Sequence, residues 1–121
     1  MSAKFRVEAA DWDMAVSDIR VVCNTLGPVA NTAMSENHWS LYLIMGPNRS
    51  VRFNMRAEYG DPQGMMDVTS HNYAVTESEI RHWDYPAIRH LTVRMTYTTI
   101  ITARFHCYLM SGGGSGCRWW V

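Results

Sequence analysis

Trp-Ser-Leu-Tyr-Leu-Ile-Met at residues 39–45 and Ser-Val-Arg-Phe-Asn-Met-Arg at residues 50–56 decide the fold, and Gly-Pro-Asn-Arg at 46–49 separates them. Apolar residues that recur at every second position predict strands buried on one side. Two such runs around a short Gly-Pro-Asn loop predict a β-hairpin that pairs 39–45 with 50–56. The alternation of the second run puts Val51, Phe53 and Met55 on one face and Arg52 and Asn54 on the other.

The segments around this hairpin predict further strands and short helices. Apolar, β-branched residues at 19–23 favour a strand, residues 24–37 favour a loop, and 66–73 favours a third strand. Thr76 and Glu79 fit a capping box, which predicts a short helix to about Trp83. The pattern of residues 88–101 fits both a strand and a helix, and we expect a helix there followed by a strand at 104–110. We therefore predict an α+β fold, a small antiparallel sheet with a few short helices.

Length and composition predict a single domain over residues 1–121. Hydrophobic residues make up 47% of the chain and charged residues 18%, which is enough apolar material for a packed core. Lysine plus arginine equals aspartate plus glutamate, at 11 each, so no overall field draws nucleic acid. No apolar run reaches the ~20 residues of a membrane helix, and the first residues do not resemble a secretory signal.

Cysteine usage favours a reducing compartment, and we expect a cytoplasmic protein. The three cysteines, Cys23, Cys107 and Cys117, are an odd number without C-x-x-C spacing, which argues against a disulfide framework and against a zinc site. The scattered histidines give no metal-ligand pattern. Phosphate-binding and dinucleotide-binding fingerprints are also missing, so we expect neither a metal nor another cofactor.

The first segment that could carry chemistry is Asn37-His38-Trp39. A histidine at the start of a hairpin strand is held rigidly, as a general base must be. A structural role is the alternative, because a lone histidine is more often a capping or half-buried residue.

The second segment is Gly114-Ser115-Gly116-Cys117-Arg118. Glycines let the backbone approach a substrate closely and can offer amide donors to an oxyanion. The arginine adds a positive charge beside the thiol, which favours the nucleophilic thiolate. The alternative is an inert buried cysteine in a glycine-rich turn.

Together the two segments resemble the circularly permuted papain-like proteins, which include lecithin-retinol-acyltransferase-like and NlpC/P60-related thiol enzymes. His38-Trp39-Ser40-Leu41-Tyr42 is similar to the histidine motif of that family, and Gly116-Cys117-Arg118-Trp119-Trp120-Val121 is similar to its cysteine motif. The resemblance implies a permuted papain-like (NlpC/P60-like) fold with His38 as base and Cys117 as nucleophile. The family's third polar residue lies on the strand after the histidine, which corresponds here to Asn54 or Arg52. Asn54 is preferred because an amide oxygen can accept the imidazole N–H.

The chain also resembles a group of small uncharacterised fungal proteins over most of its length. These share Asn-His-Trp-Ser, Ser-Val-Arg and Gly-Cys-Arg-aromatic-Trp blocks, a likeness that implies no activity. We assign substrate contacts to the residues that flank the catalytic pair, namely Trp39, Gly116, Arg118 and Trp119.

The leading hypothesis is acyl transfer through a Cys117 thioester, with His38 as general base. Water as acceptor would give a peptidase or amidase, and an amine would give a transferase. One alternative is an aminoacyl transferase that forms small peptides, such as cyclodipeptides, from charged tRNA. The other is a non-catalytic binding module with the papain-like fold. The expected partner is a small acyl or aminoacyl substrate, without a membrane and without nucleic acid unless it is tRNA. The oligomeric state stays open.

Overall fold

Six strands form a single mixed sheet in the computed structural model, which describes residues 3–28, 35–58, 61–74 and 79–104. The strand order is β1-β5-β4-β3-β2-β6, and neighbouring strands are antiparallel except for the parallel pair β1 and β5. The elements are β1 (Ala3–Arg6), the 3-10 turn η1 (Ala9–Asp11), β2 (Asp18–Pro28), β3 (Ser35–Gly46), β4 (Arg49–Glu58), β5 (Asp61–His71), β6 (Glu79–Pro86) and α1 (Val93–Thr102).

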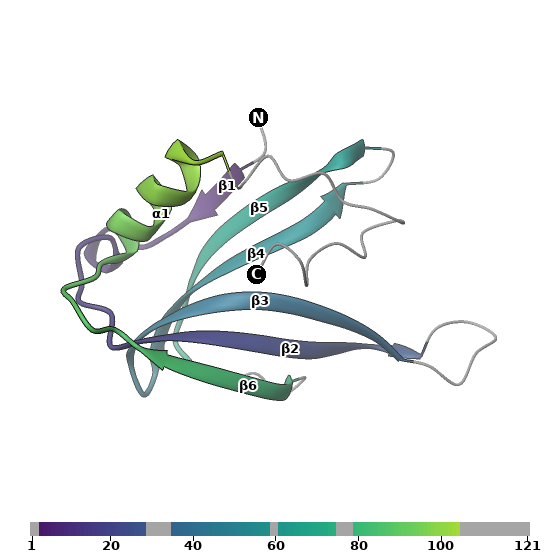
Figure 1. Cartoon of the computed structure of the whole chain (residues 1–121), viewed down its shortest axis with the longest axis horizontal. Coiled ribbons are helices and arrows are strands. Elements are labelled where there is room, and N and C mark those ends of the chain that lie inside the picture. Colours follow the sequence, from purple (N-terminus) through teal and green to yellow (C-terminus); the bar gives the residue numbers. More distant parts are fainter. Residues whose placement is uncertain (1–2, 29–34, 59–60, 75–78, 105–121) are drawn as a thin grey trace.

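The predicted hairpin is confirmed as β3 and β4. Their paired residues run from Gly46–Arg49 next to the turn to Leu41–Phe53. Beyond Leu41–Phe53 the two strands diverge, with β4 staying beside β5 and β3 staying beside β2 (Figure 1). The sheet therefore consists of two arms that are joined near the turn of this hairpin.

One face of the sheet carries the main hydrophobic core. Val51, Phe53 and Met55 alternate along β4 and are fully buried there, as their spacing predicted. The helix α1 contributes Val93 and Ile100 to the same core, and it lies beside β1 (Figure 1). Because the sheet and α1 both bury apolar side chains in this core, the packing determines which face of each strand points inward.

Two hydrogen-bonding features fix the position of α1. The Thr92 hydroxyl accepts a hydrogen bond from the Met95 amide at 3.2 Å, which caps the first turn of the helix. The Val16 amide donates to the Leu91 carbonyl at 2.9 Å, so the segment before the helix is tied to the segment before β2.

The prediction of a helix ending near Trp83 is wrong for the part that the structure describes. Residues Glu79–Pro86 form β6, which pairs with β2 from Asp18–Pro86 to Asn24–Glu79. The capping-box pattern is a local signal only. The strand instead gains a full ladder with β2 and a ring contact between Trp83 and Trp39, and such tertiary contacts routinely override helix propensity.

The predicted α+β fold class is also wrong. The described residues form a small β-rich domain of one mixed sheet with the single α-helix α1, not a sheet with several short helices in a permuted papain-like (NlpC/P60-like) arrangement. Much of the segment 24–37, which was expected to be a loop, belongs to strands, because β2 continues to Pro28 and β3 begins at Ser35. The predicted strand at 104–110 lies outside the described residues, apart from Arg104 itself, which follows α1.

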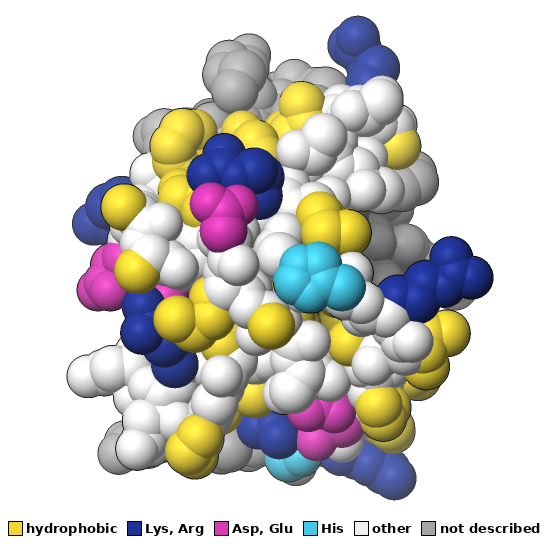
Figure 2. Space-filling view, turned by 90° about the vertical axis from the view of Figure 1, so that its left-hand side faces the viewer, with side chains coloured by type: hydrophobic (Ala, Val, Ile, Leu, Met, Phe, Trp, Pro, Cys, Tyr) yellow, Lys and Arg dark blue, Asp and Glu magenta, His cyan; other side chains and the backbone are white. Residues whose placement is uncertain are grey.

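Basic, acidic and apolar side chains are interspersed on the surface shown in Figure 2, with no area of a single charge sign. This agrees with equal numbers of acidic and basic residues in the sequence. Among the described residues, no helix is both long and apolar enough to cross a membrane.

Candidate functional site

The second face of the sheet lies opposite the main core and carries polar side chains beside a small apolar cluster. Strand alternation puts Arg52 and Asn54 of β4 there, because their neighbours Val51 and Phe53 point into the core. Both side chains are partly buried. We call this surface the polar face, and it comprises Ser40, Tyr42, Arg52, Asn54, Asp67, Thr69 and His71.

Arg52 is the central cation of the polar face. Its guanidinium lies over the Tyr42 ring, 5.8 Å from the ring centroid, and its Nη2 donates to Asn54 Oδ1 at 3.4 Å. Its Nε is buried and has no hydrogen-bond partner among the described residues. A buried N–H donor without a partner lowers the stability of the fold, and a ligand that brings a hydrogen-bond acceptor would recover this loss.

Ser40 is the second unsatisfied group of this face. It is 0% exposed, and its hydroxyl has no hydrogen-bond partner in the described part of the chain. Ser40 lies in β3, one residue beyond Leu41, whose pairing with Phe53 is the last described pair before the arms diverge. A donor-acceptor hydroxyl is therefore held at the junction of the two arms, close in sequence to His38.

His71 closes the β5 side of the polar face. Its Nε2 and the Thr69 hydroxyl are 2.7 Å apart, and its ring lies 4.8 Å from the Tyr73 ring. Burial lowers the pKa of His71 below its usual value, and the positive charge of Arg52 lowers it further. The imidazole is therefore neutral at neutral pH.

The lowered pKa of His71 predicts that acid weakens the fold. Between the folded-state pKa and the unfolded value of about 6.5, the unfolded chain binds more protons, so stability falls as the pH falls. We expect His71→Gln to reduce the loss of thermal stability between neutral and mildly acidic pH. The same substitution at exposed His90 is the control. Equal pH dependence of wild type and His71→Gln would contradict the assignment.

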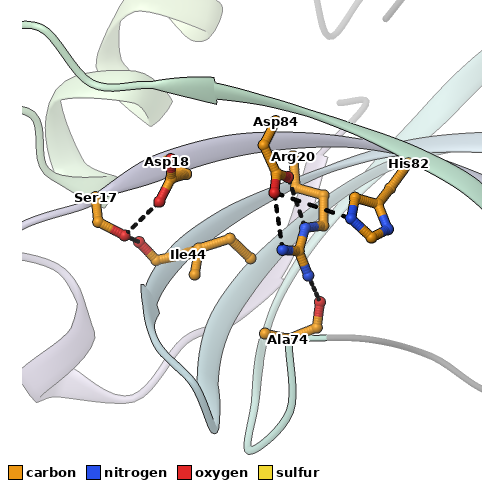
Figure 3. Close-up of polar contacts among 7 residues, drawn as sticks. All are labelled: Ser17, Asp18, Arg20, Ile44, Ala74, His82 and Asp84. Carbon is orange, nitrogen blue, oxygen red and sulfur yellow. Dashed lines mark hydrogen bonds and ion pairs between the residues drawn. The ribbon is translucent and has the colours of Figure 1, made fainter.

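Arg20 forms an ion pair within the other arm and a hydrogen bond to the segment after β5. Arg20 of β2 donates through Nε and Nη2 to Asp84 of β6 at 2.7 and 3.0 Å, and through Nη1 to the Ala74 carbonyl at 2.6 Å (Figure 3). The hydrogen bonds from Arg20 hold the pKa of Asp84 below its ordinary value. His82 stands 3.9 Å from the same carboxylate. The hydrogen bond from Arg20 to the Ala74 carbonyl holds Ala74 against the apolar cluster of Val22, Tyr42 and Ile44.

The structure brings together only some of the predicted site residues. Arg52 and Asn54 contact each other, and the backbone of His38 lies in β3 opposite Asn24. His38 has no described backbone pair on β4, since the β3–β4 ladder ends at Leu41–Phe53. The predicted residues Gly116, Cys117, Arg118 and Trp119 lie outside the described residues.

Trp39 does not join Arg52 and Asn54. It packs against the main core and stacks on Trp83, with ring centroids 5.6 Å apart and an interplanar angle of 11°. Strand alternation explains this position, because Trp39 and Ser40 are neighbours and must point to opposite faces. The predicted substrate contact of Trp39 therefore lies on the face away from Arg52.

A buried carboxylate in η1, that of Asp11, was not among the predicted site residues. Asp11 is 1% exposed, and its Oδ1 accepts from Arg49 Nε at 2.5 Å while its Oδ2 accepts from the Ser70 hydroxyl at 2.6 Å. No local sequence pattern predicts this site, because its partners Arg49 and Ser70 lie 38 and 59 residues away along the chain. Among the described side chains, no group of three or more histidine, cysteine, aspartate or glutamate residues is arranged to hold a metal ion.

Comparison with known proteins gives a family. No curated protein sequence and no solved structure matches the chain significantly. Residues 19–121 match a protein family, and this range includes the whole hairpin, the polar face and the cysteine motif. The chain therefore belongs to the family described as Domain of unknown function (DUF7770).

Proposed function

We propose that this protein is a thiol-dependent acyltransferase or hydrolase in which Cys117 forms a thioester and His38 acts as general base. The polar face would bind the acyl substrate. The observation that supports the proposal most is the buried Ser40 hydroxyl without a partner, which lies two residues beyond His38 in β3.

The chemistry would proceed in two balanced steps. His38 takes the thiol proton of Cys117, and the thiolate attacks the acyl carbonyl carbon. A thioester forms while the leaving group departs with the proton from His38. Water or an amine then attacks the thioester, gives its proton to His38, and releases the acyl product as the thiol is restored.

The polar residues of the sheet have supporting roles in this proposal. Asn54 or Arg52 would orient the imidazole, and amides around Gly116 would stabilise the oxyanion. Arg118 and Trp119 would contact substrate. Arg52 can also hold a carboxylate or carbonyl of the substrate, because its Nε is a buried donor without a described partner. No cofactor is needed, and a catalytic thiol would be kept reduced in the cytoplasm.

A small ester or amide is a better substrate than a charged tRNA. A protein that holds tRNA needs clustered lysine and arginine, whereas this sequence has equal numbers of acidic and basic residues and the face shown in Figure 2 mixes both charge signs. Aminoacyl transfer would therefore use a small activated aminoacyl donor. A non-catalytic binding module is the second candidate, and it is favoured by the stacking of Arg52 on Tyr42, which can retain an anionic ligand without any reaction.

Incubation with p-nitrophenyl acetate followed by peptide mass spectrometry tests the thioester. We expect one acetyl group on Cys117 and a burst of p-nitrophenolate, both absent from Cys117→Ser. His38→Ala should slow the acetylation by about 100-fold or more, the usual contribution of a general base. Cys23→Ser is the matched control and should acetylate normally, because Cys23 is buried in β2.

Two results would separate the candidates. Equal acetylation of wild type and Cys117→Ser would contradict the thioester. Carboxylate binding that requires Arg52, without any acetylation of Cys117, would show a binding module instead.

A further inference from the structure

A polar pocket at the turn end of the sheet shares His71 with the polar face but is lined by none of the residues proposed to carry out the thioester chemistry. It has a volume of about 420 Å³ and opens to solvent. It is formed where η1, the β3–β4 turn and the end of β5 meet. The pocket is lined by Glu8, Asp11, Asn48, Arg49, Ser70, His71 and Asn72.

The floor of this pocket is a fixed ion pair. The Asp11 carboxylate receives Arg49 Nε on one oxygen and the Ser70 hydroxyl on the other. The Ser70 oxygen in turn accepts the Glu8 amide at 3.0 Å. Because Arg49 and Ser70 hold the carboxylate and the Glu8 amide holds Ser70, the guanidinium has a defined orientation before any ligand arrives.

Arg49 keeps free donors for a ligand. Its side chain is 39% exposed, and its bond to Asp11 uses Nε. The two Nη nitrogens have no hydrogen-bond partner among the described residues. A guanidinium anchored at Nε presents these nitrogens as a planar fork, which matches the two oxygens of a carboxylate.

The charges around the fork select the kind of anion. Asp11 compensates Arg49, and His71 is neutral at neutral pH because burial and Arg52 lower its pKa. Glu8 adds an exposed carboxylate to the lining, which repels a phosphate dianion and attracts an ammonium group. The side-chain amides of Asn48 and Asn72 can donate to or accept from either end of the ligand.

We propose that this pocket binds a free amino acid, whose carboxylate is held by Arg49 and whose ammonium group is held by Glu8. A zwitterion satisfies both charged groups at once, whereas a simple anion meets the Glu8 carboxylate without compensation. This site does not depend on Cys117, so it stands or falls independently of the proposed acyl transfer.

Saturation-transfer NMR of the full chain with an equimolar mixture of the twenty proteinogenic amino acids tests the proposal. We expect transfer to at least one amino acid. Its N-acetyl and its carboxamide derivatives should each bind about tenfold more weakly or worse, because each loses one charge contact. Inorganic phosphate should not displace it.

Variants locate the binding. Glu8→Gln should weaken binding about tenfold without affecting folding, since its exposed side chain has no described contact. Arg49→Lys keeps the charge beside Asp11 but loses the fork, and a similar loss is expected. Asp13→Asn, an exposed acidic residue outside the pocket, is the control. Absence of transfer, displacement by phosphate, or unchanged affinity in Glu8→Gln would overturn the proposal.

Discussion

Replacement of Phe53 by alanine is expected to lower the free energy of unfolding by about 3–5 kcal/mol, the usual cost of truncating a buried phenylalanine. Phe53 is 0% exposed and lies at the centre of the sheet, opposite Leu41 on β3 and Val68 on β5. Both neighbouring strands are held in place by their backbone ladders, so the space left by the ring cannot collapse easily. Small domains have about 5–15 kcal/mol of stability, so this variant is expected to be near its limit.

Urea unfolding followed by fluorescence measures this loss. Tyr85→Ala is the matched control, because Tyr85 is also an aromatic strand residue but is 57% exposed. Its effect should be much smaller than that of Phe53→Ala. A loss below about 1 kcal/mol for Phe53→Ala would contradict the position of the core, since such a value is typical of a site that is not tightly packed.

Asp11→Ala is expected to have the second largest effect on stability, about 2–4 kcal/mol. The substitution removes the buried carboxylate that Arg49 and Ser70 share as an acceptor. It also removes the connection between η1 and the ends of β4 and β5. Thermal unfolding at neutral pH measures the effect.

The sequence supplies a close control for this prediction, because Asp13 is two residues away. Its ion pair with Arg94 is exposed on both sides, at 72% for Asp13 and 58% for Arg94. Solvent screens such a pair, so Asp13→Ala should leave the unfolding midpoint nearly unchanged. Equal effects of Asp11→Ala and Asp13→Ala would show that the Asp11 carboxylate is not buried in solution.

The hairpin could be predicted because its information is local. Alternation along residues 50–56 separates Phe53 from Arg52, and a short turn joins two adjacent strands. The helix predicted before Trp83 is wrong because strand pairing with β2 outweighs the capping box. The paired strand β2 lies far away in the sequence, since Arg20 and Asp84 are 64 residues apart. Local sequence patterns carry no information about contacts between residues so far apart in the chain.

The candidate site shows the same division. Arg52 and Asn54 could be placed on one face from their spacing, and the structure joins them by a hydrogen bond. Trp39 was assigned to substrate by its closeness to His38 in sequence, yet neighbouring strand residues point to opposite faces. Asp11 was overlooked because both of its partners are distant in the chain.

The rate at which iodoacetamide alkylates each cysteine at mildly acidic pH tests the proposed pairing of Cys117 with His38 most directly. A thiolate stabilised by an imidazolium stays reactive below the ordinary thiol pKa, whereas burial of Cys23 protects it. We predict that Cys117 is labelled much faster than Cys23 and Cys107, and that His38→Ala removes this advantage. Slow and uniform labelling of all three cysteines, or fast labelling of Cys117 that persists in His38→Ala, would contradict the pairing.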